Sequence, residues 1–152
     1  TEFESENIRS GGGKMSEKEV GIFLESHFYA SKKIRALEAE RRQLRMTAQG
    51  TGINYESIGS AGTRQNGTEK TYLRLADDEA KIDARIAQLR EEQSRVRAAI
   101  DKLNNPDLEA VLIYRFILHH TIDKTAKHLR YAPSTVAYKQ QKAIKLLCNF
   151  LD

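Results

Sequence analysis

The chain has 152 residues, of which 39% are hydrophobic and 30% charged, with two prolines and no tryptophan. This balance favours extended, solvated helices over one large globular core, and the length suits one domain or two small ones. A formal net charge of +4 is compatible with a polyanionic partner but does not require one. The single cysteine, Cys148, excludes an intrachain disulfide and a cysteine-based zinc site.

The segment 1–15 contains three consecutive glycines and almost no apolar side chains, which predicts a disordered N-terminal region. Met15-Ser16 would make a natural start, so an added leader is one interpretation of the residues before it. No stretch has the length of a membrane span and no signal peptide is visible. We therefore expect a cytoplasmic protein without a membrane partner.

Two long apolar stripes predict a coiled-coil-like helical hairpin over residues 16–104. In each stripe the apolar positions alternate by four and three residues, which is the 3.5-residue repeat of coiled coils. The first stripe comprises Phe23, His27, Ala30, Ile34, Leu37, Arg41 and Leu44, and the second comprises Leu75, Glu79, Ile82, Ile86, Leu89, Gln93, Val96, Ile100 and Leu103. The stripes could pair as an antiparallel hairpin within one chain or between chains, which leaves a homo-oligomer open.

Between the stripes, residues 49–71 contain five glycines and many polar side chains. Loops of this length are unusual in compact domains, and we expect a flexible glycine-rich linker. After the second stripe, Asn104-Asn105-Pro106-Asp107 is expected to end the helix, since proline disfavours helical geometry at the residue before it. A third helix is then predicted from about Asp107 to His119.

The segment 121–147 carries the pattern of a helix-turn-helix. This motif needs a small residue where the helices cross, a permissive residue in the turn and a β-branched apolar residue that locks the second helix. Ala126 and Val136 meet the first and third requirements, whereas Arg130 stands where a left-handed glycine is usual. Residues 105–152 are therefore predicted to form a C-terminal trihelical helix-turn-helix domain, and the chain as a whole is predicted to be all-α.

The same segment is basic, with six Lys or Arg residues and one acid between Asp123 and Lys145, which favours a nucleic-acid partner. A helix in the major groove contacts bases with its N-terminal half and phosphates with cations further along. Ser134, Thr135 and Tyr138 are accordingly assigned to base or near-base contact, although Tyr138 could equally pack within the domain. The other residues predicted to contact DNA are Arg130, Lys139, Gln141, Lys142 and Lys145.

Several positions resemble region 4 of sigma-70-type factors, namely Leu112-x-x-Arg115-Phe116, Thr121, Ala126, Leu129-x-Tyr131, Thr135-Val136 and Lys142-Ala143-Ile144-Lys145-Leu146-Leu147. With the preceding hairpin and glycine-rich loop, they resemble the prophage-encoded regulators of Gram-positive bacteria related to ArpU, a late-transcription control group. The resemblance implies a phage or prophage transcriptional regulator in a bacterial host. It also implies double-stranded DNA as the partner, with RNA polymerase as a second candidate.

Two other functions stay open on the sequence: an RNA polymerase-binding adaptor that barely touches DNA, and a small-terminase-like subunit for phage DNA packaging. No catalytic motif is convincing. His119 and His120 would point about 100° apart on a helix and could not share a metal ion. The chain also lacks H-E-x-x-H, a phosphate-cradling glycine motif before a lysine and a nucleophile elbow. We therefore expect no enzyme, no metal and no cofactor.

Overall fold

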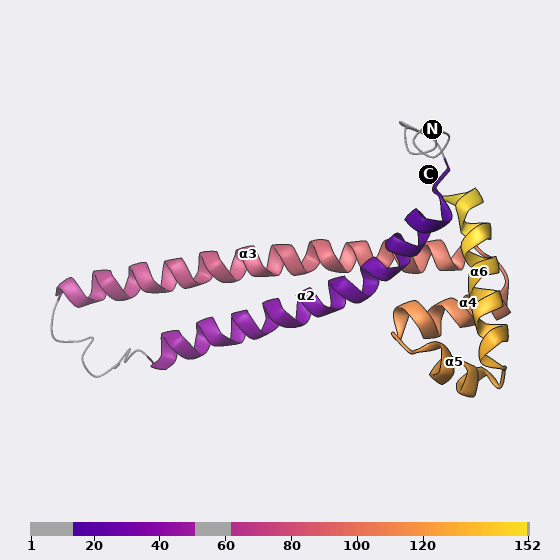
Figure 1. Ribbon diagram of the computed structural model, residues 1–152. Helices are drawn as coiled ribbons and strands as arrows, with labels where there is room; N and C mark the ends of the chain where they lie inside the picture. The colour runs from indigo at the N-terminus through magenta and orange to yellow at the C-terminus, as the bar shows by residue number, and fades with distance from the viewer. Residues whose placement is uncertain (1–13, 51–61, 152) are drawn as a thin grey trace, which may run out of the picture. The chain divides into compact units, whose positions relative to one another are not determined.

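The computed structural model describes residues 14–50 and 62–151, which contain helices and turns but no strand. The helices are α2 (Glu17–Gly50), α3 (Gly62–Asp101), α4 (Pro106–Leu112), η1 (Ile113–Ile117), α5 (Ile122–Leu129) and α6 (Pro133–Phe150), as Figure 1 shows. The predicted all-α class, a long helical hairpin followed by shorter helices, is confirmed. In the described part of the chain, no helix combines the length and apolar content that crossing a membrane requires.

The long helices extend further than the sequence predicts. α3 begins at Gly62 rather than at Tyr72, so residues 62–71 belong to a helix and not to the expected loop. Each residue added to an existing helix gains a backbone hydrogen bond, which offsets the cost of about 1 kcal/mol for a glycine. The remainder of that loop, residues 51–61, lies outside the described residues, as do residues 1–13 of the predicted disordered segment.

The chain divides into two compact units. Unit 1 comprises Thr1–Tyr29 and Glu92–Asp152, and unit 2 comprises Ala30–Glu91. Both long helices therefore contribute to both units, whereas the sequence predicts a boundary at Asn105 between the hairpin and a separate helix-turn-helix domain. In unit 1, apolar residues from the ends of the hairpin and from the shorter helices share one core.

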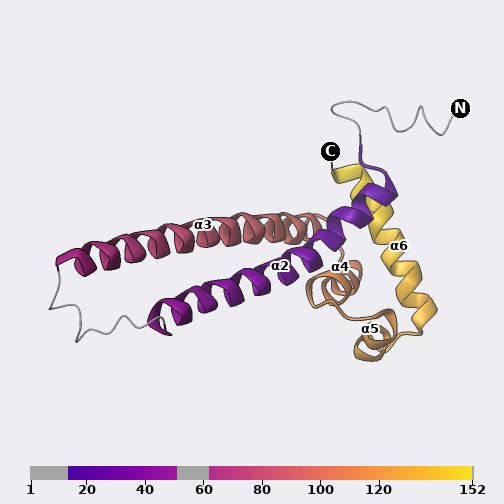
Figure 2. The ribbon, with the colours of Figure 1, turned by 60° about the vertical axis from the view of Figure 1, so that its left-hand side comes forward.

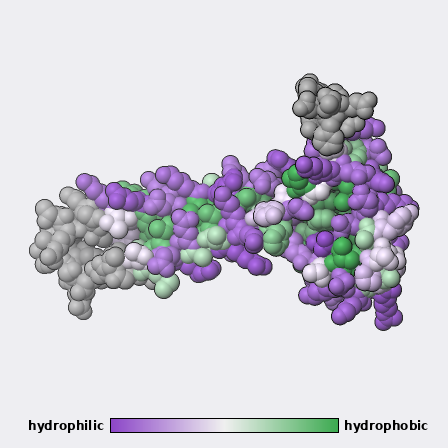
Figure 3. Space-filling model, in the orientation of Figure 1, coloured by the Kyte–Doolittle hydropathy of each residue, from purple (hydrophilic) through white to green (hydrophobic). Residues whose placement is uncertain are grey.

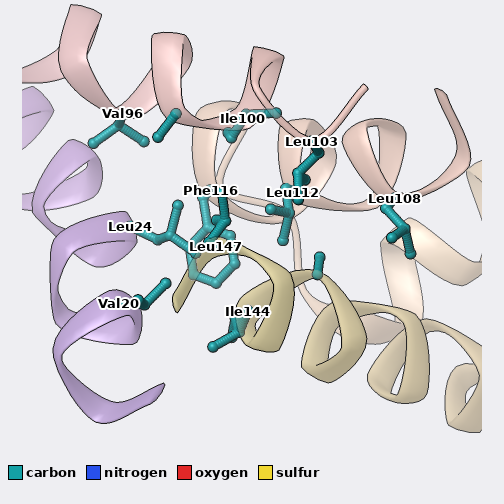
Figure 4. Packing of buried hydrophobic residues seen from close by; sticks show 12 residues of the cluster. Val20, Leu24, Val96, Ile100, Leu103, Leu108, Leu112, Phe116, Ile144 and Leu147 are labelled. Atoms are coloured by element: carbon teal, nitrogen blue, oxygen red, sulfur yellow. The ribbon is translucent and has the colours of Figure 1, made fainter. Parts of the chain in front are cut away.

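The core of unit 1 joins side chains from α2, α3, α4, η1 and α6 (Figure 4). Val20 and Leu24 of α2 are fully buried there, while Phe23, which the sequence placed on the apolar stripe, is only partly buried. In this unit α2 therefore buries a different face from the one that carries the predicted stripe, because the helix packs against α6 as well as α3. The buried members of this core are Val20, Leu24, Val96, Ala99, Ile100, Leu103, Leu108, Leu112, Phe116, Ala143, Ile144 and Leu147.

In unit 2, α2 and α3 lie side by side, as Figures 1 and 2 both show. Their buried residues, Ala30, Ile34, Ile82, Ile86 and Leu89, all belong to the predicted stripes. Two polar members of the stripes, Arg41 and Glu79, form ion pairs between the helices instead. Arg41 pairs with Asp83, and Arg45 Nε lies 2.6 Å from Glu79 Oε1. Figure 3 accordingly shows hydrophilic residues along the edges of this helical pair, with apolar residues between them.

The turn between α5 and α6 is left-handed at Arg130, where φ is 60° and ψ is 42°. The backbone N–H of Tyr131 donates to the carbonyl of Ala126 at 2.9 Å, which closes the C-terminus of α5. Among L-residues this conformation brings Cβ close to the following carbonyl oxygen, at a cost of roughly 1–2 kcal/mol. Arg130 therefore occupies the conformation that glycine usually supplies, and the turn is strained.

Replacing Arg130 by glycine is expected to relieve this strain and raise the free energy of unfolding by about 1 kcal/mol. For a chain of this size the melting temperature should rise by roughly 2–4 °C in thermal unfolding followed by circular dichroism. The matched control is Lys127→Gly, at an exposed position inside α5, where glycine should instead destabilise by about 1 kcal/mol. A variant at Arg130 that melts at or below the wild-type temperature would contradict the strain argument.

Candidate nucleic-acid interface

The helix-turn-helix is held by a small apolar cluster. Val111 of α4, Ala126 of α5 and Val136 of α6 are buried together, with exposed fractions of 0%, 3% and 0%. Ala126 and Val136 are the two marker positions that the sequence identified. The predicted N-cap is confirmed as well, because the Thr121 hydroxyl accepts a hydrogen bond from a backbone N–H in the first turn of α5 at 3.1 Å. Pro133 begins α6, as expected of a residue without an N–H.

The predicted third helix is divided into α4 and a π-helical turn, Ile113–Ile117. After it, His119 adopts a positive φ of 60°. Arg115 lies in this turn, and its Nε donates to Gln140 Oε1 at 2.8 Å while Nη1 donates to the carbonyl of His120 at 2.5 Å. Burial lowers the pKa of the Arg115 guanidinium. Arg115 thus ties the segment before α5 to α6, a role that the sequence did not reveal.

A second link joins α4 to α6 through Asp107. Its carboxylate accepts hydrogen bonds from the Lys139 ammonium and the Tyr131 hydroxyl, and the Lys139 nitrogen lies 5.1 Å from the centre of the Tyr131 ring. The bonds from Lys139 and Tyr131 lower the pKa of Asp107, and the bond to Asp107 raises the pKa of both donors.

This ion pair gives Lys139 a partner within the domain. The sequence assigned Lys139 to DNA, but it lies on the flank of α6 that faces α4, where Asp107 is its partner. The sequence could not predict that Lys139 contacts Asp107 and Tyr131. The three residues lie on different segments, α4, the turn and α6, and no short-range spacing relates them. We therefore leave Lys139 out of the candidate interface and treat it as a residue that positions α6.

The other predicted contact residues of α6 lie away from its buried side. Ser134, Lys142 and Lys145 are exposed, and Thr135 is half-buried. The Tyr138 side chain is 67% exposed, so of the two interpretations of this residue the structure favours an outward-facing aromatic side chain over one packed in the domain. These side chains oppose Val136, Ala143 and Leu147, which anchor α6 in the two apolar clusters.

Exposed cations continue this surface onto α5 and the turn. Lys124 and Lys127 of α5 and Arg130 of the turn are all exposed. Gln141 is exposed on one edge of α6, where its Nε2 donates to Glu17 Oε2 of α2 at 2.8 Å. The surface therefore combines hydroxyl, aromatic and amide groups with several cations, the combination that proteins use to contact base edges and phosphates.

Across residues 14–50 and 62–151, no three His, Cys, Asp or Glu side chains are grouped in a way that could hold a metal ion. His27 and His119 do approach each other, with 2.9 Å between Nδ1 of His27 and Nε2 of His119. Burial and the nearby His119 lower the pKa of His27.

No family model matches the sequence. No curated protein and no solved structure is significantly similar to it either.

Proposed function

We propose that this protein is a sequence-specific DNA-binding regulator of phage or prophage transcription, acting in the cytoplasm of a bacterial host through a sigma region 4-like helix-turn-helix. The observation that carries the proposal is the exposed basic side of α6. Val136 and Ala143 anchor the buried side of α6 in the domain, and Tyr138 and Lys142 project from the opposite, exposed side. Protein recognition of the major groove uses a helix anchored in this way.

The proposed contacts with bases and with phosphates follow the order of residues along α6. Ser134, Thr135 and Tyr138 lie in the N-terminal half and are proposed to contact bases or the groove floor. Lys142 and Lys145 follow, and are proposed to neutralise phosphates. The cations of α5 and Arg130 would extend the phosphate contacts beyond α6. The function is recognition of double-stranded DNA and includes no catalytic step.

Lys142→Ala tests the phosphate contact directly. The affinity of the full chain for duplex DNA should fall steeply with salt, and the slope of log K against log salt should decrease by about one unit in the variant because one phosphate contact is lost. Fluorescence anisotropy of a labelled duplex, titrated at several salt concentrations, measures this slope. The control is Lys81→Ala, which removes an exposed lysine of unit 2 and should leave the slope unchanged.

The outcomes separate the candidate functions. A full chain without affinity for duplex DNA at low salt would overturn the proposal. Co-purification with RNA polymerase in that case would support the adaptor alternative. A ring of many subunits in light scattering would support the DNA-packaging alternative, and a DNA-binding protein with a wild-type slope in Lys142→Ala would exclude Lys142 as a phosphate ligand.

A further inference from the structure

The first turn of α2 lies beside the candidate DNA surface. Val20 and Leu24 share the core of unit 1 with Ile144 and Leu147 of α6 (Figure 4), so the first two turns of α2 contribute to the same core as α6. The backbone N–H of Met15 also donates to the carbonyl of Leu151 at 3.3 Å. The start of α2 is thereby fixed along the C-terminal half of α6, although more than one hundred residues separate them in the sequence.

Glu17 reaches α6 from this position. Its Oε2 accepts a hydrogen bond from Gln141 Nε2 at 2.8 Å. A neighbouring observation agrees with the placement, because burial and the charges of Glu17 and Glu19 raise the pKa of Cys148, two turns further along the same edge of α6. The acidic first turn of α2 therefore borders one edge of the basic surface.

A carboxylate beside an amide determines how the amide is oriented. An ionised carboxylate only accepts hydrogen bonds, whereas the two ends of a glutamine amide are a donor NH2 group and an acceptor oxygen. Glu17 consequently holds the NH2 end of Gln141 toward α2. Glu17 accepts a hydrogen bond from one N–H of the Gln141 amide. The second N–H and the amide oxygen are then free to bind adenine in the major groove, where the N–H donates to N7 and the oxygen accepts from N6.

We propose that Glu17 is a specificity-determining positioning residue: it fixes the amide of Gln141 for contact with an adenine edge, so that the hairpin takes part in sequence recognition by the helix-turn-helix. This inference rests on the proposed DNA-binding function. It adds a residue of α2 to an interface that the sequence placed wholly within residues 130–145. It also gives Gln141 a base-contacting role, at the border of the surface, rather than a passive exposed position.

The test is selection of the full chain on a library of random duplex DNA, followed by sequencing of the bound fraction. The wild-type protein should enrich an adenine at one position of its site. Gln141→Ala and Glu17→Ala should both reduce that discrimination by about tenfold, which is within the range of one bidentate base contact. Glu17→Gln should lose it in part, because a second amide can donate as well as accept and no longer fixes the orientation.

Glu19→Gln is the matched control. It removes the same charge from the same turn of α2, while the carboxylate that accepts the hydrogen bond from Gln141 belongs to Glu17, so the adenine preference should be unchanged. Unaltered preference in Glu17→Ala, or an equal loss in Glu19→Gln, would overturn the positioning role. Failure of the wild-type chain to bind any duplex is a different result, because it would remove the proposed function and this inference together. Melting curves of each variant should match the wild type, since Glu17 and Gln141 are exposed.

Discussion

Replacing Leu24 by aspartate is expected to destabilise the helix-turn-helix and abolish DNA binding, although Leu24 belongs to the long hairpin. The side chain is fully buried among residues of α3, η1 and α6. A buried carboxylate without a partner, together with the loss of leucine packing, should cost about 3–5 kcal/mol. Domains of this size have a total stability of about 5–15 kcal/mol. Circular dichroism should therefore show a large decrease in the melting temperature, with loss of affinity in DNA titrations.

The control for this experiment lies two residues away. Ile22 is on the same helix but is 59% exposed, so Ile22→Asp should change stability by no more than about 0.5 kcal/mol. If Leu24→Asp melted and bound DNA like the wild type, the shared core of unit 1 would be refuted. The helix-turn-helix would then be independent of α2, as a boundary at Asn105 implies.

Leu89→Asp should destabilise unit 2 by a similar amount. Leu89 is 3% exposed and packs with Ile34 and Ile86 in the core between α2 and α3. Placing a charge there should cost about 3–5 kcal/mol, which should appear as faster amide hydrogen exchange across Ala30–Glu91 and as a lower first melting transition. Leu73→Asp provides the comparison, because Leu73 is on the same helix and 67% exposed.

The concentration dependence of the same melts tests how the hairpin pairs. In the structure α2 and α3 pack against each other within one chain, so the midpoints should not depend on protein concentration. A midpoint that rises with concentration would show that the stripes pair between chains instead. If the Leu89→Asp variant had the melting temperature of the wild type, the apolar seam would have been assigned to the wrong face of α3.

Local features of the helix-turn-helix could be predicted because they depend on a few neighbouring residues. Thr121 caps α5 and Pro133 begins α6, since these residue types suit those backbone positions wherever they occur. Ala126 and Val136 were identified from residue type and spacing, and they are buried in one cluster. The apolar period likewise predicted the residues buried in unit 2, where two helices meet along a single seam.

The candidate interface was only partly predictable. The outward position of Lys142 follows from the periodicity of α6, whereas the exposure of Tyr138 stayed open on the sequence and the partners of Lys139 and Gln141 could not be predicted from it. Lys139 donates a hydrogen bond to Asp107 and Gln141 donates one to Glu17, because α4 and α2 lie against opposite edges of α6. Contacts across such distances in the chain leave no periodic or local signal.

By itself, then, the sequence determined the helical class, the apolar seam of unit 2, the N-cap of α5, the proline that begins α6 and the basic character of the helix-turn-helix, because each depends on residue type and short-range spacing. Tertiary structure alone decided three things. The first is that Val20 and Leu24 join the core beneath α6. The second is that Arg115 joins the carbonyl of His120, before α5, to Gln140 of α6. The third is which polar side chains of α6 remain turned outward, since that depends on the charged groups that α2 and α4 bring to its edges.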